Sequence, residues 1–270
     1  MTIPNVLSIA GVDPSGGAGI AADLKTFAAL GAYGMAAVTA VTVQNTHGVR
    51  GFELLAPAFV ADQVDAVFED VRVDAVKIGM VGSAAVAEAI GAALARHGAR
   101  HVVLDPVMVA KGGDALLAAD AVAAIRVCLA PLAEVVTPNL PEAAVLLDTG
   151  EPADVAGMRA MARDLLALGP QAVLLKGGHL EGPEASDVYC DVSGSETLSA
   201  PRVATKNTHG TGCTLSSAIA ALLPRYPRRE AVARAKDYVT GAIRAADRLA
   251  VGSGHGPLHH GFATDGFSGR

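Results

Sequence analysis

The stretch Val6-Leu-Ser-Ile-Ala10, followed by Gly11-Val-Asp-Pro-Ser-Gly-Gly-Ala-Gly19, indicates the fold of this chain. Residues 6–10 form a short, largely apolar run, as expected for a strand buried on both faces of a parallel sheet. The glycine-rich segment then opens an apolar helical pattern that ends near Gly31. Glycines at the start of a helix let backbone amides approach a ligand closely. The stretch therefore predicts a strand–loop–helix unit in which the loop binds a ligand. A tight turn without a ligand fits the same residues.

The same unit recurs along the chain. Short apolar runs predict further strands at residues 36–43, 75–78, 102–104, 135–137 and 172–175. Apolar residues at helical spacing separate some of these runs, namely Val60, Val64, Val67 and Val71, and Met158, Met161, Leu165 and Leu168. Alternating strands and helices imply right-handed crossovers, so we predict an α/β fold with a mostly parallel central sheet and helices on both faces.

Residues 182–206 interrupt this alternation. Two short strands at residues 187–192 and 196–198, around Ser193-Gly194, predict a hairpin at the edge of the sheet. Helices are expected at residues 211–223 and 230–249, and an irregular tail at residues 252–270. Because the sequence contains no linker, residues 1–270 are predicted to form a single domain.

The composition excludes several classes of protein. Of the 270 residues, 51% are hydrophobic and 18% are charged, which argues against a disordered chain. A net charge of −6 without a basic run argues against nucleic acid or an anionic membrane as the partner. Gly31 and Gly34 interrupt the apolar part of the charge-free residues 26–49, and a polar segment follows, so this stretch predicts no membrane span. Three cysteines without a CxxC pair and a first segment without a basic start predict a cytoplasmic protein.

Distinctive side chains follow five of the predicted strands at their carboxyl ends. They are Gln44, Met80, Asp105, the pair Asn139 and Glu142, and Lys176. Ligands of such sheets bind beyond the carboxyl ends of the strands, so these residues are expected to surround one site. An ammonium group at the end of a buried strand is costly unless an anion is near, and Lys176 therefore predicts a phosphate contact.

The two carboxylates of this set suit a magnesium ion. Mg²⁺ is usually held by one or two carboxylates together with water and substrate phosphates, and Asp105 and Glu142 meet that description. Local structure explains the same residues in another way. Asn139 and Glu142 match a capping box with Pro141 in the first helical turn, and Asp105 before Pro106 is common in turns.

The segment Asn207-Thr-His-Gly-Thr-Gly-Cys-Thr-Leu215 predicts an anion site. Gly210 and Gly212 lie at the start of an apolar helix, where unpaired amides and the positive helix end suit a phosphoryl group. Cys213 falls in the first turn, where the pKa of a thiol is expected to be lowered. It can act as a general base toward a hydroxyl, or as a nucleophile paired with His209. A small buried cysteine without a chemical role is the third interpretation.

Weaker patterns leave other functions open. Gly17-Ala-Gly-Ile-Ala-Ala22 matches a dinucleotide fingerprint, which makes an NAD-type oxidoreductase an alternative, but Gln44 stands where an acidic ribose ligand is expected. A catalytically inactive binding module is a third class. The segment Lys111-Gly-Gly-Asp114 is either a lid or a solvated turn. Three histidines of the tail can suggest a metal, although flexible surface histidines explain them better: His255, His259 and His260.

Taken together, these motifs resemble the hydroxymethylpyrimidine/phosphomethylpyrimidine kinases of thiamine biosynthesis. The resemblance covers essentially the whole chain and rests on residues 10–20, Val43-Gln-Asn-Thr46, Lys77-Ile-Gly-Met80, Asp105-Pro-Val-Met108, Thr137-Pro-Asn139 with Glu142, Lys176-Gly-Gly-His179 and His209-Gly-Thr-Gly-Cys213. It implies a ribokinase-like fold, ATP with Mg²⁺, and a homodimer. The implied reaction phosphorylates 4-amino-5-hydroxymethyl-2-methylpyrimidine and then its monophosphate.

The resemblance also implies roles for individual residues. Gln44 matches the residue that reads the aminopyrimidine, and its amide offers a donor beside an acceptor. The other implied substrate contacts are Met80 and Val107 as apolar walls, and Gly11, Ala18 and Asp23 in the first loop. The metal region matches Asp105 and Glu142, and the nucleotide region matches Asn139, Lys176, His209, Thr211 and Lys236. The implied catalytic group consists of Lys176, Gly210, Gly212 and Cys213.

Cys213 departs from the wider ribokinase-like group, in which the last position of this turn is usually aspartate. A thiol holds its proton more tightly than a carboxyl group, so the resemblance leaves open whether Cys213 is the only base. Some relatives phosphorylate pyridoxal, and a pyridoxal or pyridoxine kinase is therefore the alternative within the same superfamily.

Overall fold

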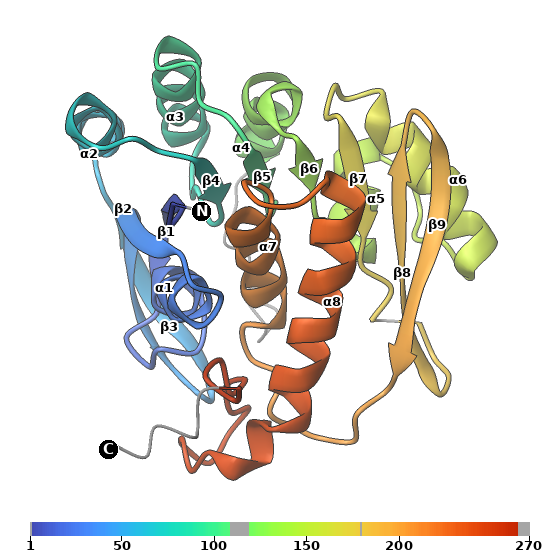
Figure 1. Ribbon diagram of the computed structural model, residues 1–270. Coiled ribbons are helices and arrows are strands. Elements are labelled where there is room, and N and C mark those ends of the chain that lie inside the picture. The colour runs from blue at the N-terminus through green and yellow to red at the C-terminus, as the bar shows by residue number, and fades with distance from the viewer. Residues whose placement is uncertain (1, 109–118, 179, 264–270) are drawn as a thin grey trace.

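The described strands form one mixed sheet in the order β3-β2-β1-β4-β5-β6-β7-β8-β9 (Figure 1). The computed structural model describes residues 2–108, 119–178 and 180–263. Neighbours from β2 to β7 pair in parallel, whereas β3, β8 and β9 pair antiparallel to their neighbours. The expectation of a mostly parallel central sheet is thus confirmed.

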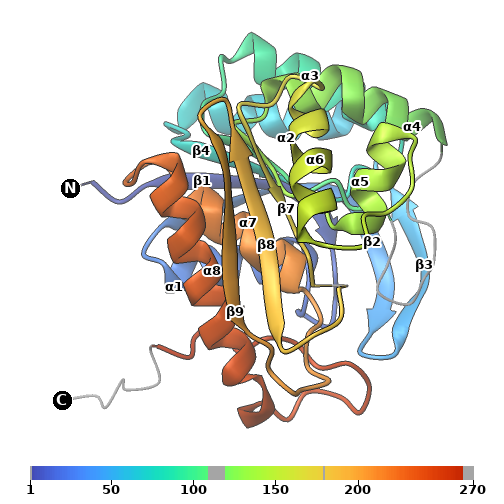
Figure 2. The ribbon, with the colours of Figure 1, turned by 90° about the vertical axis from the view of Figure 1, so that its right-hand side faces the viewer.

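All six predicted central strands are present, some with different ends. The strands are β1 (Asn5–Val12), β2 (Tyr33–Asn45), β3 (Gly48–Leu54), β4 (Ala75–Ile78), β5 (Val102–Leu104), β6 (Val135–Val136), β7 (Ala172–Leu175), β8 (Glu184–Asp191) and β9 (Gly194–Pro201). The predicted hairpin is β8–β9, which is longer than expected and lies at one edge of the sheet (Figure 2). Strand β3 was not predicted, because residues 48–54 contain glycines and charges and lack a continuous apolar run.

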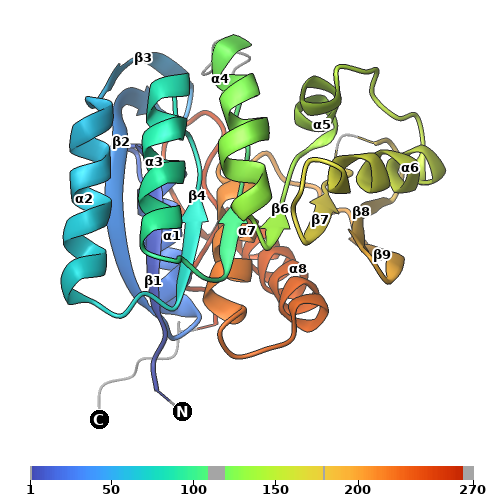
Figure 3. The same cartoon turned by 90° about the horizontal axis from the view of Figure 1, so that it is seen from above.

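Helices cover both faces of the sheet (Figure 3). One face carries α2 (Pro57–Asp70), α3 (Ala84–Arg96), α4 (Ala119–Ala124), α5 (Leu140–Leu147) and α6 (Val155–Leu166), and the other carries α1 (Gly19–Ala29), α7 (Thr211–Leu222) and α8 (Arg228–Arg244). Successive strand residues point to opposite faces. Leu7 and Ile9 therefore belong to the hydrophobic core on the side of α2, α3, α5 and α6, and Val6 belongs to the core on the side of α1, α7 and α8. This double burial explains why the central strands read as continuous apolar runs.

Several ends differ from the predicted ones. Helix α8 ends at Arg244 and is followed by a short 3₁₀ turn, Ala246–Arg248, where one helix to residue 249 was expected. A π-helical turn, Ile125–Leu129, and a 3₁₀ turn, Ala130–Leu132, connect α4 to β6. Among the described residues, no helix is long and apolar enough to span a bilayer.

The described part of the tail, residues 252–263, contains no helix or strand but packs against the body of the protein. Leu258 is buried, and Pro257 forms an isolated bridge with His209. His260 Nε2 lies 3.0 Å from Thr214 Oγ1, and burial lowers the pKa of His260 to about 4. The prediction of surface histidines is therefore wrong for His260, whereas His255 is exposed as expected.

Candidate functional site

A cavity of about 490 Å³ lies at the carboxyl ends of the central strands. Fourteen of the sixteen predicted site residues line it: Gly11, Ala18, Gln44, Met80, Asp105, Val107, Asn139, Glu142, Lys176, His209, Gly210, Thr211, Gly212 and Cys213. Parallel strands end at one edge of the sheet, and this shared edge is what brings segments from both halves of the sequence together.

Lys176 lies beside two carboxylates that line the cavity with it. Its Nζ donates to Asp105 Oδ1 at 2.9 Å and lies 3.7 Å from Glu142 Oε2. Thr137 and Ser216 also donate to Asp105, at 3.2 and 3.3 Å. Burial alone would lower the pKa of Lys176, but Asp105 and Glu142 raise it above its ordinary value. The lysine is therefore a fixed positive charge beside the cavity.

The electrostatics of the two carboxylates leave room for a further cation. Burial opposes ionisation of Asp105, but Lys176 and Lys77 outweigh it and hold the pKa of Asp105 below its usual range. Burial and the neighbouring Asp105 raise the pKa of Glu142 to about 7, although Lys176 opposes the shift. Lys176 and Lys77 thus do not fully compensate the two buried carboxylates. In the described part of the chain no third histidine, cysteine or carboxylate joins them as a metal ligand.

The capping box at the start of α5 is confirmed. Glu142 N donates to Asn139 Oδ1, and Asn139 N donates to Glu142 Oε2, each at 2.8 Å. The cap keeps the Glu142 carboxylate at the strand end beside Lys176. The capping and ligand interpretations of Glu142 are therefore compatible, because the same hydrogen bonds that start the helix orient the carboxylate toward the cavity.

The first turn of α7 faces the cavity without a side-chain cap. Gly210 precedes the helix in the left-handed region, with φ of 79°, and a Cβ there would overlap the carbonyl of Gly17. A Cβ at Gly212 would lie 3.1 Å from Lys176 Nζ. These two glycines allow the helix start, the first loop and Lys176 to approach one another closely. Amides of a first helical turn lack intrahelical acceptors, and here they suit an anion.

The thiol of Cys213 is less acidic than expected. Burial raises its pKa to about 11, with help from the carboxylates of Asp23 and Asp105. Lys77 and the amide of Gly19 oppose this shift but do not overcome it. The expectation that the helix start lowers the pKa is therefore wrong, because Cys213 lies in a desolvated site in which the cost of burying a thiolate exceeds the effect of the helix end.

Asp13 organises the glycine-rich loop and was missed in the sequence. Its carboxylate accepts from the amides of Ser15, Gly17 and Ala18 at 2.8, 3.2 and 2.9 Å, and from His209 Nε2 at 2.8 Å. These hydrogen bonds overcome the cost of burial and lower the pKa of Asp13 to about 2. These backbone amides were expected to bind a ligand, but they donate to Asp13 instead. The dinucleotide interpretation of this loop is weakened for the same reason. The sequence Asp-Pro-Ser could have predicted this role, because aspartate in a turn often accepts a hydrogen bond from the amide two residues later.

Gln44 and an apolar patch also line the cavity. Thr42 Oγ1 lies 3.2 Å from Gln44 Oε1, and Gln44 Nε2 lies 3.2 Å from His209 Nε2. Met80 packs with Ala40, and the partly buried Val107 packs against them. A polar amide beside an apolar wall suits a flat heteroaromatic ring.

Two predicted site residues do not line the cavity. Asp23 is fully buried and binds Ser8, Lys77 and Ser217, so its predicted contact with substrate is wrong. Lys236 donates to Ala185 O and to Asp187 Oδ2, and Asp187 in turn accepts from Gly177 N.

Lys236 is therefore not placed to touch a nucleotide in this cavity, and it supports the segment after β7 through Asp187 instead. Two other predicted features, the segment of residues 111–114 and His179, lie outside the described residues.

Comparison with known proteins identifies the family of this chain. A family model described as phosphomethylpyrimidine kinase matches residues 13–259. The hydroxymethylpyrimidine/phosphomethylpyrimidine kinase of Salmonella typhimurium is 54% identical over 257 residues, which cover 95% of this chain and 97% of that protein. The protein of the same name from Escherichia coli is 51% identical with the same coverage.

Solved structures are also similar. The phosphomethylpyrimidine kinase of Clostridium difficile has a TM-score of 0.79 at 42% identity, covering 90% of this chain and 100% of that one. The pyridoxal kinase of Staphylococcus aureus, solved with AMP-PCP and pyridoxal, has a TM-score of 0.89 at 32% identity, covering 98% and 96%. With its ribokinase-like α/β fold, this chain belongs to the hydroxymethylpyrimidine/phosphomethylpyrimidine kinase family.

Proposed function

We propose that this protein transfers the γ-phosphoryl group of ATP to the hydroxymethyl group of 4-amino-5-hydroxymethyl-2-methylpyrimidine, and then phosphorylates the monophosphate to the diphosphate. The observation that carries this proposal is one cavity that is lined by an amide, an apolar wall, a lysine and an uncapped helix start. The amide and the apolar wall suit a flat polar ring, and the lysine and the helix start suit a polyphosphate.

Different residues bind the substrate, stabilise the transferred group and accept the proton in this reaction. Gln44 holds the aminopyrimidine between the apolar walls, which leaves its hydroxymethyl group toward α7. Lys176 and the amides of the α7 turn stabilise negative charge on the transferring group. Cys213 accepts the proton of the hydroxyl as the oxygen attacks phosphorus. Because little covalent chemistry is required of the protein in phosphoryl transfer, position and charge supply most of the rate.

Asp105 and Glu142 are the residues that would hold a magnesium ion. Two buried carboxylates with one lysine between them fit a cation that keeps several waters and meets phosphates. When bound, Mg²⁺ neutralises charge on the phosphates. We expect activity to require Mg²⁺, and we expect the Mg²⁺ concentration for half-maximal activity to be higher in Glu142→Gln than in the wild type.

The decisive experiment is mass spectrometry of the products formed from ATP, Mg²⁺ and the pyrimidine. Mono- and diphosphate differ by one phosphoryl group, so both steps are visible in one sample. Absence of product at millimolar substrate would overturn the proposal. Dinucleotide binding in calorimetry would favour an oxidoreductase, and stabilisation by the pyrimidine without product would favour a binding module.

Pyridoxal is the second candidate substrate, because pyridoxal kinases are among the similar structures. The sequence identity to these structures, 34% and 32%, is lower than the 54% to the Salmonella typhimurium kinase. Gln44→Ala is expected to raise KM for the pyrimidine about fivefold or more while KM for ATP and kcat change little, because a lost neutral hydrogen bond to a ring costs on the order of 1 kcal/mol or more. Equal losses with pyridoxal would contradict the assignment.

We further propose a cytoplasmic homodimer built from single-domain subunits. The three cysteines are unpaired, as expected in a reducing compartment. Val41 and Val43 on the outer face of β2 are 50% and 53% exposed, and β3 beside them also exposes apolar side chains. An exposed apolar strand pair near a sheet edge suits a second copy of the chain.

A further inference from the structure

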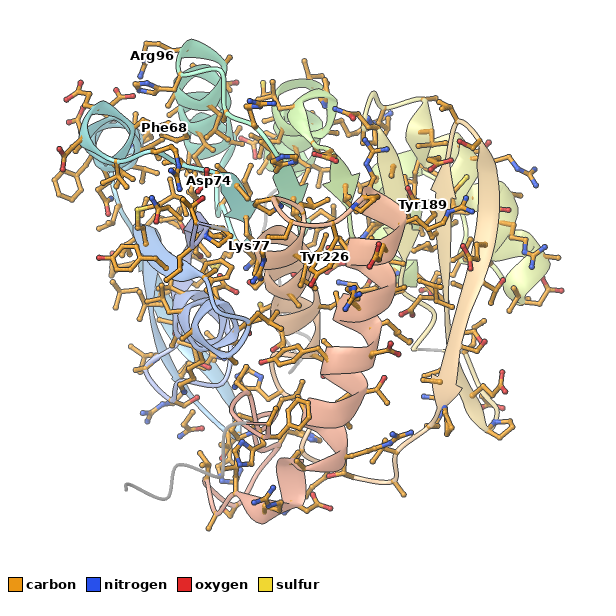
Figure 4. The ribbon with its side chains drawn as sticks, in the orientation of Figure 1. Phe68, Asp74, Lys77, Arg96, Tyr189 and Tyr226 are labelled. Atoms are coloured by element: carbon orange, nitrogen blue, oxygen red, sulfur yellow. The ribbon has the colours of Figure 1, made fainter. Side chains whose placement is uncertain are left out.

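Two lysine–carboxylate pairs lie against the first turns of α7. The first is Lys176 with Asp105, and Ser216 on α7 donates to that Asp105. The second is Lys77 on β4 with Asp23 on α1. Figure 4 shows Lys77 inside the molecule, where α7 and the sheet meet. The first pair belongs to the phosphate region described above, whereas the second has no role in the reaction so far.

The second pair lies beneath Cys213. Ser217 Oγ donates to Asp23 Oδ1 at 2.6 Å, and Ser217 lies four residues after Cys213. Residues four apart occupy the same face of a helix. The face of α7 that carries Cys213 therefore rests on the Lys77–Asp23 pair. Cys213 and Lys77 also line the same cavity.

Lys77 has a hydrogen-bond donor to spare. Its side chain is 0% exposed, and Nζ donates to both oxygens of Asp23, at 3.0 and 2.8 Å. An ammonium group has three donors. Within the described chain, no acceptor is in place for the third. Gly79 makes room for this ammonium, since a Cβ there would lie 2.8 Å from Nζ. A fully buried ammonium with an unused donor is costly unless an anion forms beside it.

The charges around the Cys213 sulphur come from four elements. Asp23 on α1 and Asp105 after β5 disfavour a thiolate, whereas Lys77 on β4 favours it, and Lys176 after β7 interacts with it as well. Lys77 provides the largest influence that lowers the pKa of Cys213 against burial. The hydrogen bonds point the same way. Both oxygens of Asp23 are occupied by Ser8, Lys77 and Ser217, whereas Lys77 keeps one donor that a sulphur anion can accept.

We infer that Lys77, held in place by Asp23, is a positioning residue that stabilises the thiolate form of Cys213. This inference rests on the proposed kinase reaction. There the thiolate takes the hydroxyl proton, the substrate oxygen forms its bond to the γ-phosphorus, and the bond to ADP breaks. The Lys77 side chain is fully buried and is held by Asp23. It acts through Cys213 by raising the fraction of protein in which the sulphur is ready to accept a proton.

The test measures the reactivity of Cys213 itself. In a Cys128→Ser/Cys190→Ala background, Cys213 is the only thiol, and its alkylation by iodoacetamide is followed against pH by mass spectrometry. Lys77→Met/Asp23→Asn replaces the pair by an uncharged pair of similar size. We expect its alkylation profile to move to higher pH, with a rate at pH 8 lower by roughly three- to tenfold, since one pH unit corresponds to a factor of ten. The kcat profile with ATP and the pyrimidine is expected to move in parallel.

Ser217→Ala is the matched control. It removes a hydrogen bond to Asp23 and leaves both charges in place, so the alkylation profile is expected to stay where it is. Circular dichroism checks that each variant folds, and Lys77→Met alone, with Asp23 free to take up a proton, is the second variant. An unchanged or lower midpoint in the folded double variant would overturn the inference, as would an equal shift in Ser217→Ala. Failure of the wild type to phosphorylate the pyrimidine would instead overturn the proposed function, because alkylation does not depend on turnover.

Discussion

At the scale of single residues, the proposed reaction depends most on Cys213. If its thiolate is the general base, Cys213→Ala is expected to lose about 10²–10⁴-fold in kcat with little change in KM. The active form is deprotonated and its pKa is about 11, so kcat of the wild type is expected to rise with pH from neutrality toward about 10. Cys213→Asp is expected to recover part of the loss at pH 7. Steady-state kinetics across pH measures both effects, and near-normal kcat in Cys213→Ala would remove the role of Cys213.

A second prediction for a single residue concerns the contribution of Asp13 to the free energy of unfolding. Its pKa in the folded protein is about 2, below the ordinary 3.8, so its carboxylate stabilises the fold above pH 3.8 and loses this effect as the pH falls toward 2. The shift corresponds to about 2 kcal/mol. Asp13→Asn is therefore expected to lower the free energy of unfolding by about that amount at pH 7, and by much less near pH 2.

Urea denaturation at the two pH values tests the Asp13 prediction. The exposed Asp62 offers the control, Asp62→Asn, for which no comparable loss is expected. A loss for Asp13→Asn that is the same at both pH values would show that the hydrogen-bond geometry matters and the charge does not.

At the scale of elements, the start of α7 depends on the absence of a side chain at position 212. A Cβ there would lie 3.1 Å from Lys176 Nζ and 3.7 Å from Asp105 Oδ2. Gly212→Ala is expected to displace Lys176 and to lower kcat by about tenfold or more, while Tm changes by only a few degrees, since alanine is favoured in helices. Gly150→Ala, where a Cβ meets nothing within 4 Å, is the control. Full activity in Gly212→Ala would contradict this arrangement.

At the scale of the whole molecule, the two edges of the sheet differ in character. The β2–β3 side exposes Val41 and Val43, whereas the β8–β9 side ends in a turn at Val192, which is 97% exposed. Val41→Asp/Val43→Asp is expected to convert a homodimer to a monomer, because burying two carboxylates in an apolar interface is unfavourable. Val192→Asp is expected to leave the dimer intact. Sedimentation velocity distinguishes the two, and a dimer that survives the first change would exclude this face as the interface.

Much of the molecule is determined by local sequence. The continuous apolar runs predict β4, β5 and β7 with their observed ends, and Asn139 with Glu142 predicts the start of α5. The carboxyl ends of these strands also predict most of the cavity lining. These features follow from patterns within about ten residues, or from the rule that parallel strands end at one edge.

The long-range charge pairs and the pKa of Cys213 depend on the tertiary structure. The pair of Lys77 and Asp23 joins residues 54 positions apart, and Asp13 meets His209 across 196 positions. The pKa of Cys213 rises because other segments remove water from its surroundings, although its place in the helix alone predicts a fall. Local sequence patterns indicate which secondary structure a segment prefers and which of its side chains face the core. Charge pairing and desolvation depend on which distant segments meet, and that is a property of tertiary structure.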